Sequence, residues 1–246
     1  MAERNNSLDK ALAIMDLFET RERLTITAAS QLTGFSPTAV TRIFNSLEHA
    51  GYVYRDKLDG GYYISEKVFL LGRRTDISRQ LVNVIDDAIG DLCKKCGFSV
   101  AVSVRDDVDS ITAIRKDPAM GLLLVANTGD RISLHCSASG KILTAFSQDP
   151  DRVIDRMVFS EYTEKTITDR EEFRHQIKYV KTEGVAYDME EIIPGLVCVA
   201  VPVLGSDGFA ICSISASGYK ERVIRELYGL LEDLKAAAAT CERLLR

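Results

Sequence analysis

The stretch Phe35-Ser-Pro-Thr-Ala-Val-Thr-Arg-Ile-Phe-Asn-Ser-Leu-Glu-His-Ala-Gly51 decides the fold of the first part of the chain. Ser36 before Pro37 is a strong helix-start signal. A serine side chain accepts a hydrogen bond from a free amide of the first turn, and proline at the first helical position loses no hydrogen bond through its missing N–H group. We predict a helix from about Pro37 to Ala50, ended by Gly51. Its apolar face contains Val40, Ile43, Phe44 and Leu47, and its polar face contains Thr38, Arg42, Asn45 and His49, with Thr41 on the flank.

Two shorter helices are expected before this one. Ser7 is a candidate cap for a helix whose apolar residues, from Leu8 to Phe18, recur at steps of three and four. A second helix is expected over Thr27–Thr33, with Gly34 as its stop. Three short helices joined by a glycine-containing turn are the helix-turn-helix pattern, in which the third helix reads DNA.

A β hairpin is expected directly after the third helix. Residues 52–55 and 62–64 favour two strands, and the turn between them contains Asp59-Gly-Gly61. A hairpin in this place is a wing, and basic side chains near its tip can reach phosphates or the minor groove. The candidate DNA-contacting residues are therefore Ser36, Thr38, Thr41, Arg42, Asn45, Arg55 and Lys57. The alternative is a protein-binding module whose polar helix face is merely solvated.

The rest of the chain alternates between strands and helices. Strands are expected over 99–104, 110–115, 122–125, 185–188, 196–203 and 210–215, and helices over 76–97, 137–146, 149–158, 168–183 and from about 220 to the end. Thr168-Asp-Arg-Glu171 has the spacing of a capping box. The pattern predicts an α+β domain with a sheet of five or six mainly antiparallel strands.

Composition indicates an ordinary globular protein. Hydrophobic residues make up 46% and charged residues 27% of the 246, which argues against disorder, and no apolar run approaches the roughly 20 residues of a membrane span. No signal peptide is apparent, so we expect a cytoplasmic protein whose six cysteines stay reduced. Residues 1–75 carry 10 Lys and Arg against 9 Asp and Glu, and the remainder carries 21 against 27. This asymmetry permits a DNA-binding head on an acidic body.

Several stretches resemble the IclR family of bacterial transcriptional regulators. The head resembles it in Ser7-Leu-Asp-Lys-Ala-Leu-Ala-Ile14, in the segment from Thr33 to Ile43, and in Leu47-Glu-His-Ala-Gly-Tyr-Val53. The body resembles it at 129–135, 137–141, 183–188, 190–191, 195–202 and 213–215. The resemblance implies a winged helix-turn-helix domain at 1–65, a linker helix at 66–77, and a GAF/PAS-like effector-binding domain at 78–246.

Small polar residues on the late strands are the best candidates for a ligand site. Ser213 and Ser215 alternate with Ile214, so both hydroxyls lie on one face of a strand. By resemblance to the family, the effector pocket is lined by Leu124, Ile132, Ala138, Ser139, Asp188, Cys198, Ser213 and Ser215. The resemblance implies a compact polar effector such as an organic acid, a lactone product or an aromatic acid. The alternative is that both serines only satisfy the sheet backbone.

No catalytic signature is present, so we expect no enzyme, no cofactor and no metal site. The sequence contains no G-x-S-x-G, no P-loop and no H-E-x-x-H motif. His135 and Cys136 are expected to be adjacent on a strand, where their side chains point to opposite faces, so His135 is interpreted as structural. Cys93-Lys-Lys-Cys96 has no second ligand pair for zinc, although a redox pair stays open. The expected partners are a double-stranded operator, a small-molecule effector and further copies of the chain, as a dimer or a dimer of dimers. An enzyme with a fused helical module and a ligand-free interaction scaffold are the rival classes.

Overall fold

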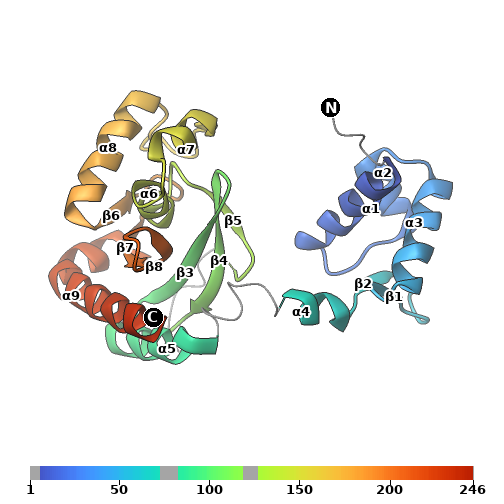
Figure 1. Cartoon of the computed structure of the whole chain (residues 1–246), viewed down its shortest axis with the longest axis horizontal. Coiled ribbons are helices and arrows are strands. Elements are labelled where there is room, and N and C mark those ends of the chain that lie inside the picture. Colours follow the sequence, from blue (N-terminus) through green and yellow to red (C-terminus); the bar gives the residue numbers. More distant parts are fainter. Residues whose placement is uncertain (1–5, 73–82, 119–126, 246) are drawn as a thin grey trace. The chain divides into compact units, whose positions relative to one another are not determined.

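The computed structural model describes residues 6–72, 83–118 and 127–245. The chain forms two compact units, residues 1–75 and 76–246, each with its own hydrophobic core (Figure 1). The helix expected at 66–77 is present as α4 (Glu66–Gly72), which counts with the first unit. Residues 73–77 lie outside the described part.

The N-terminal unit is a winged helix-turn-helix domain, as predicted. In chain order it contains α1 (Asn6–Asp16), a 3₁₀ turn (Leu17–Glu19), α2 (Ile26–Thr33), α3 (Pro37–His49), β1 (Val53–Arg55), β2 (Tyr62–Ile64) and α4. The strands β1 and β2 pair antiparallel, and Leu24 joins them through a bridge to Tyr62. Tyr62 stacks on Phe44 of α3 with ring centroids 4.1 Å apart, which fixes the wing against the third helix.

Most of the local start and stop signals act as the sequence predicts. Ser36 caps α3 by accepting from the Ala39 amide, and Gly34 ends α2 in the left-handed conformation with φ +71°. One prediction was wrong. Ser7 does not cap α1, because the helix already begins at Asn6 and Ser7 lies inside its first turn.

The C-terminal unit is α+β, as predicted. Its elements are α5 (Asn83–Cys96), β3 (Ser99–Asp106), β4 (Asp109–Lys116), β5 (Arg131–Ser133), α6 (Ala138–Ala145), α7 (Pro150–Arg156), α8 (Arg170–Glu183), β6 (Ala186–Met189), β7 (Leu196–Leu204), β8 (Ala210–Tyr219) and α9 (Lys220–Leu244). The sheet order is β5-β4-β3-β8-β7-β6, and every neighbouring pair is antiparallel.

The sheet separates two layers of helices (Figure 1). On one face, the valines of β3 and β7 pack with Ile85 and Ile89 of α5 and with Leu230 and Leu234 of α9. On the other face, a second core joins α6, α7 and α8 to β6 and β7. Because successive side chains of a strand point to opposite faces, neighbouring residues of each central strand belong to different cores.

Four details of the C-terminal unit differ from expectation. The short strand β5 was not predicted, and β8 continues to Tyr219 instead of ending at 215. Helix α8 is capped by Asp169, which accepts from the Glu172 amide, so Thr168 is not the capping residue. His135 and Cys136 lie in a turn after β5, and the expectation that they lie on a strand was wrong. The expected strand at 122–125 lies outside the described residues.

Candidate functional site

The polar face of α3 is exposed, as expected of a recognition helix. Thr38, Arg42 and Asn45 are all exposed, while Val40 and Phe44 of the same helix are fully buried in the core. Within the described part of the chain, the Arg42 guanidinium makes no hydrogen bond or ion pair. Its five donors are therefore available to base edges or phosphates.

Two of the predicted DNA-contacting residues already have local roles. The Ser36 hydroxyl caps α3, and the Thr41 hydroxyl donates to the Pro37 carbonyl at 2.8 Å. Both side chains therefore shape the helix first, and their contact with DNA stays a prediction.

The wing tip is ordered by its own polar contacts. The Arg55 Nε donates to the Gly60 carbonyl at 3.3 Å, and Lys57 is exposed. Asp59 forms an ion pair with Arg23 at 2.7 Å and accepts from the Tyr63 hydroxyl at 2.7 Å. Hydrogen bonds from the Gly61 amide and from Tyr63 lower the pKa of Asp59. This pairing leaves Lys57 and part of Arg55 as the cationic groups of the tip.

The second candidate site is a row of polar side chains on the inward face of the C-terminal sheet. Asp188 pairs with Cys198, Cys198 with Ser217, and Ser217 with Ser99. Directly paired residues of an antiparallel sheet share a face, so these four side chains lie side by side across four strands. We call Asp188, Cys198, Ser217 and Ser99 the polar row.

A row of smaller side chains lies next to the polar row. Ala186 pairs with Ala200, Ala200 with Ser215, and Ser215 with Ala101. The Ser215 hydroxyl is 3.5 Å from the Ala101 carbonyl. The opposite face of the same strands is filled by Val100, Val102, Val197, Val199, Ile214 and Ala216. A sheet that served packing alone would be expected to be apolar on both covered faces.

Ser213 lies on the same face of β8 as Ser215 and Ser217, but it pairs with residues outside the two rows described above. It pairs with Pro202 and Ser103, is fully buried, and its hydroxyl is 3.5 Å from the Ser103 carbonyl. Ser217, which the sequence reasoning missed, stands directly beside Cys198 instead. The signal was present in the chain, since Ser213, Ser215 and Ser217 alternate, but the strand was expected to end too early to include the third serine.

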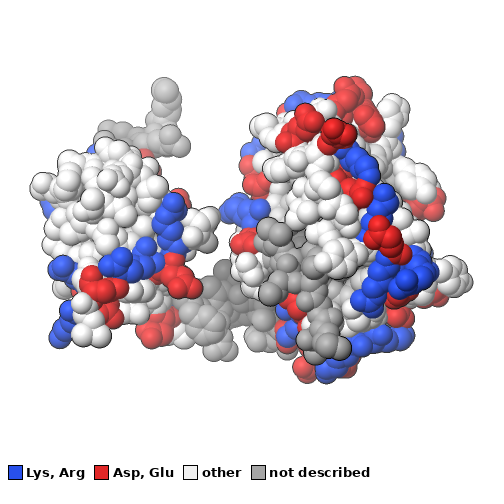
Figure 2. All heavy atoms as spheres, turned by 180° about the vertical axis from the view of Figure 1, so that it is seen from behind, with Lys and Arg blue, Asp and Glu red and all other residues white. Residues whose placement is uncertain are grey.

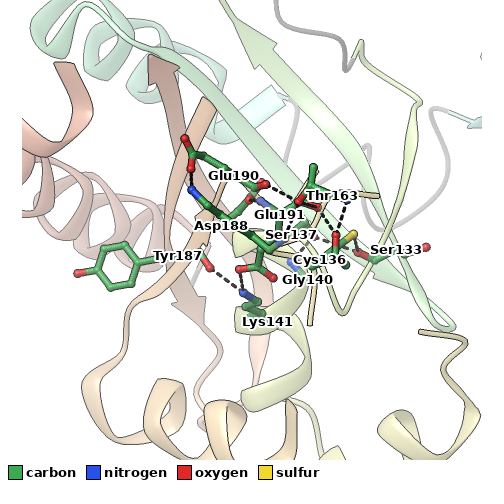
Figure 3. A network of polar contacts seen from close by, with 12 residues as sticks. Ser133, Cys136, Ser137, Gly140, Lys141, Thr163, Tyr187, Asp188, Glu190 and Glu191 are labelled. Atoms are coloured by element: carbon green, nitrogen blue, oxygen red, sulfur yellow. Dashed lines mark hydrogen bonds and ion pairs between the residues drawn. The ribbon is translucent and has the colours of Figure 1, made fainter. Parts of the chain in front are cut away.

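A buried ion pair lies beside Asp188 (Figure 3). The Lys141 ammonium contacts the Glu191 carboxylate and donates to the Tyr187 carbonyl at 2.8 Å, and its side chain is fully buried. The Asp188 carboxylate accepts from the Glu191 amide at 2.6 Å. The second oxygen of Glu191 has no partner among the described residues. The sequence reasoning assigned no role to Lys141 or Glu191.

Burial dominates the titration of this cluster. It raises the pKa of Asp188 to about 7, because hydrogen bonds from backbone amides only partly offset the loss of hydration. Burial also raises the pKa of Glu191, while Lys141 lowers it. The pKa of the Cys198 thiol is raised to about 12 by burial and by Asp188, so this cysteine is a neutral lining group and not a nucleophile.

The first turn of α6 is capped by Ser137, the residue before the helix. Ser137 accepts from the Gly140 amide at 3.0 Å, which leaves the first amides of the helix, those of Ala138 and Ser139, without an intrahelical acceptor. A side chain at Gly140 would meet the Leu134 carbonyl oxygen at 2.3 Å, so the turn occupies that space. Gly140 therefore leaves no room for a ligand on that side.

Of the two apolar residues expected to line the effector pocket, the structure describes Ile132 only. Ile132 pairs with Ser110, which places it on the same inward face at the β5 edge of the sheet. Leu124 lies outside the described residues.

The remaining histidine and cysteine candidates are held by contacts with backbone carbonyls. His135 Nε2 contacts the Ser160 carbonyl at 2.9 Å, burial lowers its pKa, and burial raises the pKa of Cys136 to about 12. Cys93 is buried against the Phe98 carbonyl, and burial raises the pKa of both Cys93 and Cys96. In residues 6–72, 83–118 and 127–245, no group of histidines, cysteines and carboxylates is arranged to hold a metal ion, and no helix is long and apolar enough to cross a bilayer.

Comparisons with known proteins agree with this geometry. The family description "Bacterial transcriptional regulator IclR C-terminal" matches residues 76–243, and "IclR helix-turn-helix domain" matches residues 7–57. The chain belongs to the IclR family. It is a DNA-binding regulator of transcription with an effector-binding C-terminal domain, and it is not an enzyme.

Individual IclR-family proteins are similar over nearly the whole chain. The HTH-type transcriptional regulator XynR of Escherichia coli K12 is 26% identical over 243 residues, which cover 97% of this chain and 96% of XynR. The p-hydroxybenzoate hydroxylase transcriptional activator of Acinetobacter baylyi is 27% identical and covers 88% of this chain and 82% of its own. The structure of an IclR homolog from Microbacterium hydrocarbonoxydans complexed with 4-hydroxybenzoate has a TM-score of 0.88 at 19% identity, covering 98% of this chain and 99% of that one.

Proposed function

We propose that this IclR-family chain binds an operator as a dimer or a dimer of dimers and that a small organic acid changes its operator affinity. The observation that carries the proposal is the polar row of Asp188, Cys198, Ser217 and Ser99, which lies on a covered face of the C-terminal sheet. Polar groups in such a place require partners, and a ligand with several hydrogen-bonding atoms would supply them.

The DNA-binding part of the proposal rests on α3 and the wing. Arg42 is the candidate for base readout, with Thr38, Thr41 and Asn45 beside it and Ser36 at the helix start. Arg55 and Lys57 would contribute contacts to phosphates that do not depend on sequence. Figure 2 shows basic and acidic side chains mixed over the visible faces of both units, so the placement of the DNA contact on the head rests on α3 and the wing.

The effector-binding part uses the polar row together with neighbouring groups. We assign the effector contacts to Asp188, Cys198, Ser215 and Ser217, and we keep Ile132, Ala138 and Ser139 as further candidates. Ser213 is too deeply buried to be a first choice. The 4-hydroxybenzoate bound to one structural neighbour supports an organic or aromatic acid as the effector class.

The biological setting follows from this role. We expect the protein to control a neighbouring catabolic operon and to act in the cytoplasm, where a bacterial regulator meets the chromosome. An effector acts on DNA binding only if its affinity differs between two arrangements of the protein. We expect the spacing of two heads to be the quantity that changes.

An electrophoretic mobility shift with DNA from upstream of the chain's own gene tests the proposal. The full chain should shift this DNA, and one member of a panel of organic acids, including 4-hydroxybenzoate, should change the midpoint. Ser215→Ala should weaken that response about tenfold or more, since a lost buried hydrogen bond costs roughly 1–3 kcal/mol.

Ser206→Ala, an exposed serine in the turn before β8, is the matched control and should respond like the wild type. No shift with the upstream DNA would contradict the operator proposal. An unchanged response in Ser215→Ala, Ser217→Ala and Asp188→Ala together would place the effector site elsewhere.

A further inference from the structure

Arg115 of β4 lies on the same sheet face as the polar row. It pairs with Ala101, which pairs with Ser215, so the three side chains share a face. The next residue, Lys116, points the other way, since its ammonium forms an ion pair with Asp86 of α5 at 2.6 Å. The Arg115 side chain is only 10% exposed. A cation is therefore nearly buried at the end of the row that contains Ser215.

One edge of the Arg115 guanidinium is held in place. Its Nε and Nη2 donate to the two Asp117 oxygens at 2.9 and 2.8 Å. Burial opposes ionisation of Asp117, but the hydrogen bonds from Arg115 lower its pKa, so the pair is charged. In the described part of the chain, Nη1 makes no hydrogen bond. An arginine fixed by one edge is pre-organised to bind a second carboxylate.

The charge of Arg115 acts on the candidate site itself. It is among the groups that lower the pKa of the Cys198 thiol against the effect of burial. The other cation beside this site, Lys141, is already bound to Glu191 and to the Tyr187 carbonyl. Arg115 is thus a cation near the polar row whose Nη1 group donates to no described residue.

Asp188 lies at the opposite end of the site. Four strand-to-strand steps separate β6 from β4, which corresponds to roughly 19 Å along the sheet. Both residues lie on the inward face of the sheet, so a ligand that contacts both must extend across several strands. Such a ligand is elongated and has hydrogen-bonding groups at both ends.

We propose that Arg115 binds the carboxylate of the effector, while Asp188 hydrogen-bonds a hydroxyl group at its far end. The effector would then be an elongated hydroxy-carboxylic acid, with Ser215, Ser217 and Cys198 beneath its middle. This inference rests on the proposed effector-binding function and adds the residue that sets its specificity. A residue with a purely structural role would not distinguish an acid from its neutral analogue.

Isothermal titration calorimetry with the full chain tests the assignment through matched probes. The acids are 4-hydroxybenzoate and D-gluconate, their neutral partners are 4-hydroxybenzamide and D-glucitol, and benzoate lacks the hydroxyl. The wild type should bind at least one hydroxy acid tenfold or more tighter than its neutral partner. Arg115→Gln should abolish this preference, and Arg115→Lys, which keeps the charge, should restore part of it.

Arg105→Gln is the matched control, because Arg105 lies on the same face of β3 but is exposed. It should keep the preference for the acid. Asp188→Asn should reduce the preference for 4-hydroxybenzoate over benzoate. An unchanged acid preference in Arg115→Gln, or no binding of either hydroxy acid to the wild type, would overturn the inference. If the wild type instead released its operator in response to a neutral metabolite, the proposed function would stand and only the assignment of Arg115 as the carboxylate-binding residue would be rejected.

Discussion

At the scale of single residues, Arg42 carries the most specific expectation about DNA. Its side chain is exposed on α3, and a bidentate contact from arginine to guanine is the commonest specific contact in the major groove. Arg42→Ala should therefore cost about 1–3 kcal/mol in operator affinity at physiological salt, measured by fluorescence anisotropy. Arg21→Ala, which removes an exposed arginine bonded to Thr20, is the control and should bind normally. Equal affinity of Arg42→Ala and the wild type would reject the readout role.

Asp188 makes stability depend on pH in a direction that can be checked. Burial raises its pKa from 3.8 to about 7, so the folded state holds this proton more tightly than the unfolded state does. Its contribution to stability is complete below about pH 4 and is lost as the pH rises to about 7. Asp188→Asn cannot ionise, and its side-chain oxygen can still accept from the Glu191 amide.

The difference in unfolding free energy between Asp188→Asn and the wild type should grow in favour of the variant from pH 5 to pH 8. The expected growth is on the order of 1–4 kcal/mol. Urea unfolding at both pH values measures this difference. Asp207→Asn, at an exposed turn, should show the same difference from the wild type at both. A gain for Asp188→Asn that is independent of pH would mean that the carboxyl titrates normally.

At the scale of elements, Gly140 makes a very close contact between α6 and the turn before it, beside the proposed effector site. A Cβ at Gly140 would lie 2.3 Å from the Leu134 carbonyl oxygen and 2.4 Å from the Leu134 Cα. Both neighbours are backbone atoms and cannot rotate away. Helix α6 would have to move, and the Lys141 ammonium would move with it from Glu191 and the Tyr187 carbonyl.

Gly140→Ala should therefore destabilise the C-terminal unit by about 2–4 kcal/mol, the range for overpacking with a backbone shift. Gly229→Ala in α9 is the matched control, because a Cβ there meets no atom within 4 Å. It should stabilise the helix by about 0.5–1 kcal/mol. Differential scanning calorimetry measures both, and equal melting temperatures for the two variants would contradict the packing argument.

At the scale of the whole molecule, one chain offers a single recognition helix. Specific operators are commonly read by two heads on a pseudo-palindrome, so we expect at least a dimer. Leu70 and Leu71 of α4 are about half exposed and are candidates for the contact, as is Phe69, whose side chain lies outside the described part. Sedimentation velocity at micromolar concentration should give a mass of at least twice 27.2 kDa. A species of one chain mass would contradict the expectation.

Local patterns were sufficient for the elements whose signals lie within a few residues. Ser36-Pro37 started α3, Gly34 ended α2, and the apolar stripe of residues 220–244 predicted α9, because caps, turns and helical periodicity act over one or two turns of chain. The same period-2 logic placed Ser213 and Ser215 on one strand face. Where two local signals competed, as at Thr168 and Asp169, the pattern chose the wrong cap.

The partners of each polar residue depended on strand register and burial, which no local pattern contains. Register sets Ser217 beside Cys198 and Asp188, and it leaves Ser213 beside Pro202. The pairing of Lys141 with Glu191 joins residues fifty positions apart, and only packing of α6 on the sheet brings them together. The raised pKa of Asp188 has the same origin, because desolvation depends on how completely the tertiary structure covers a carboxyl group.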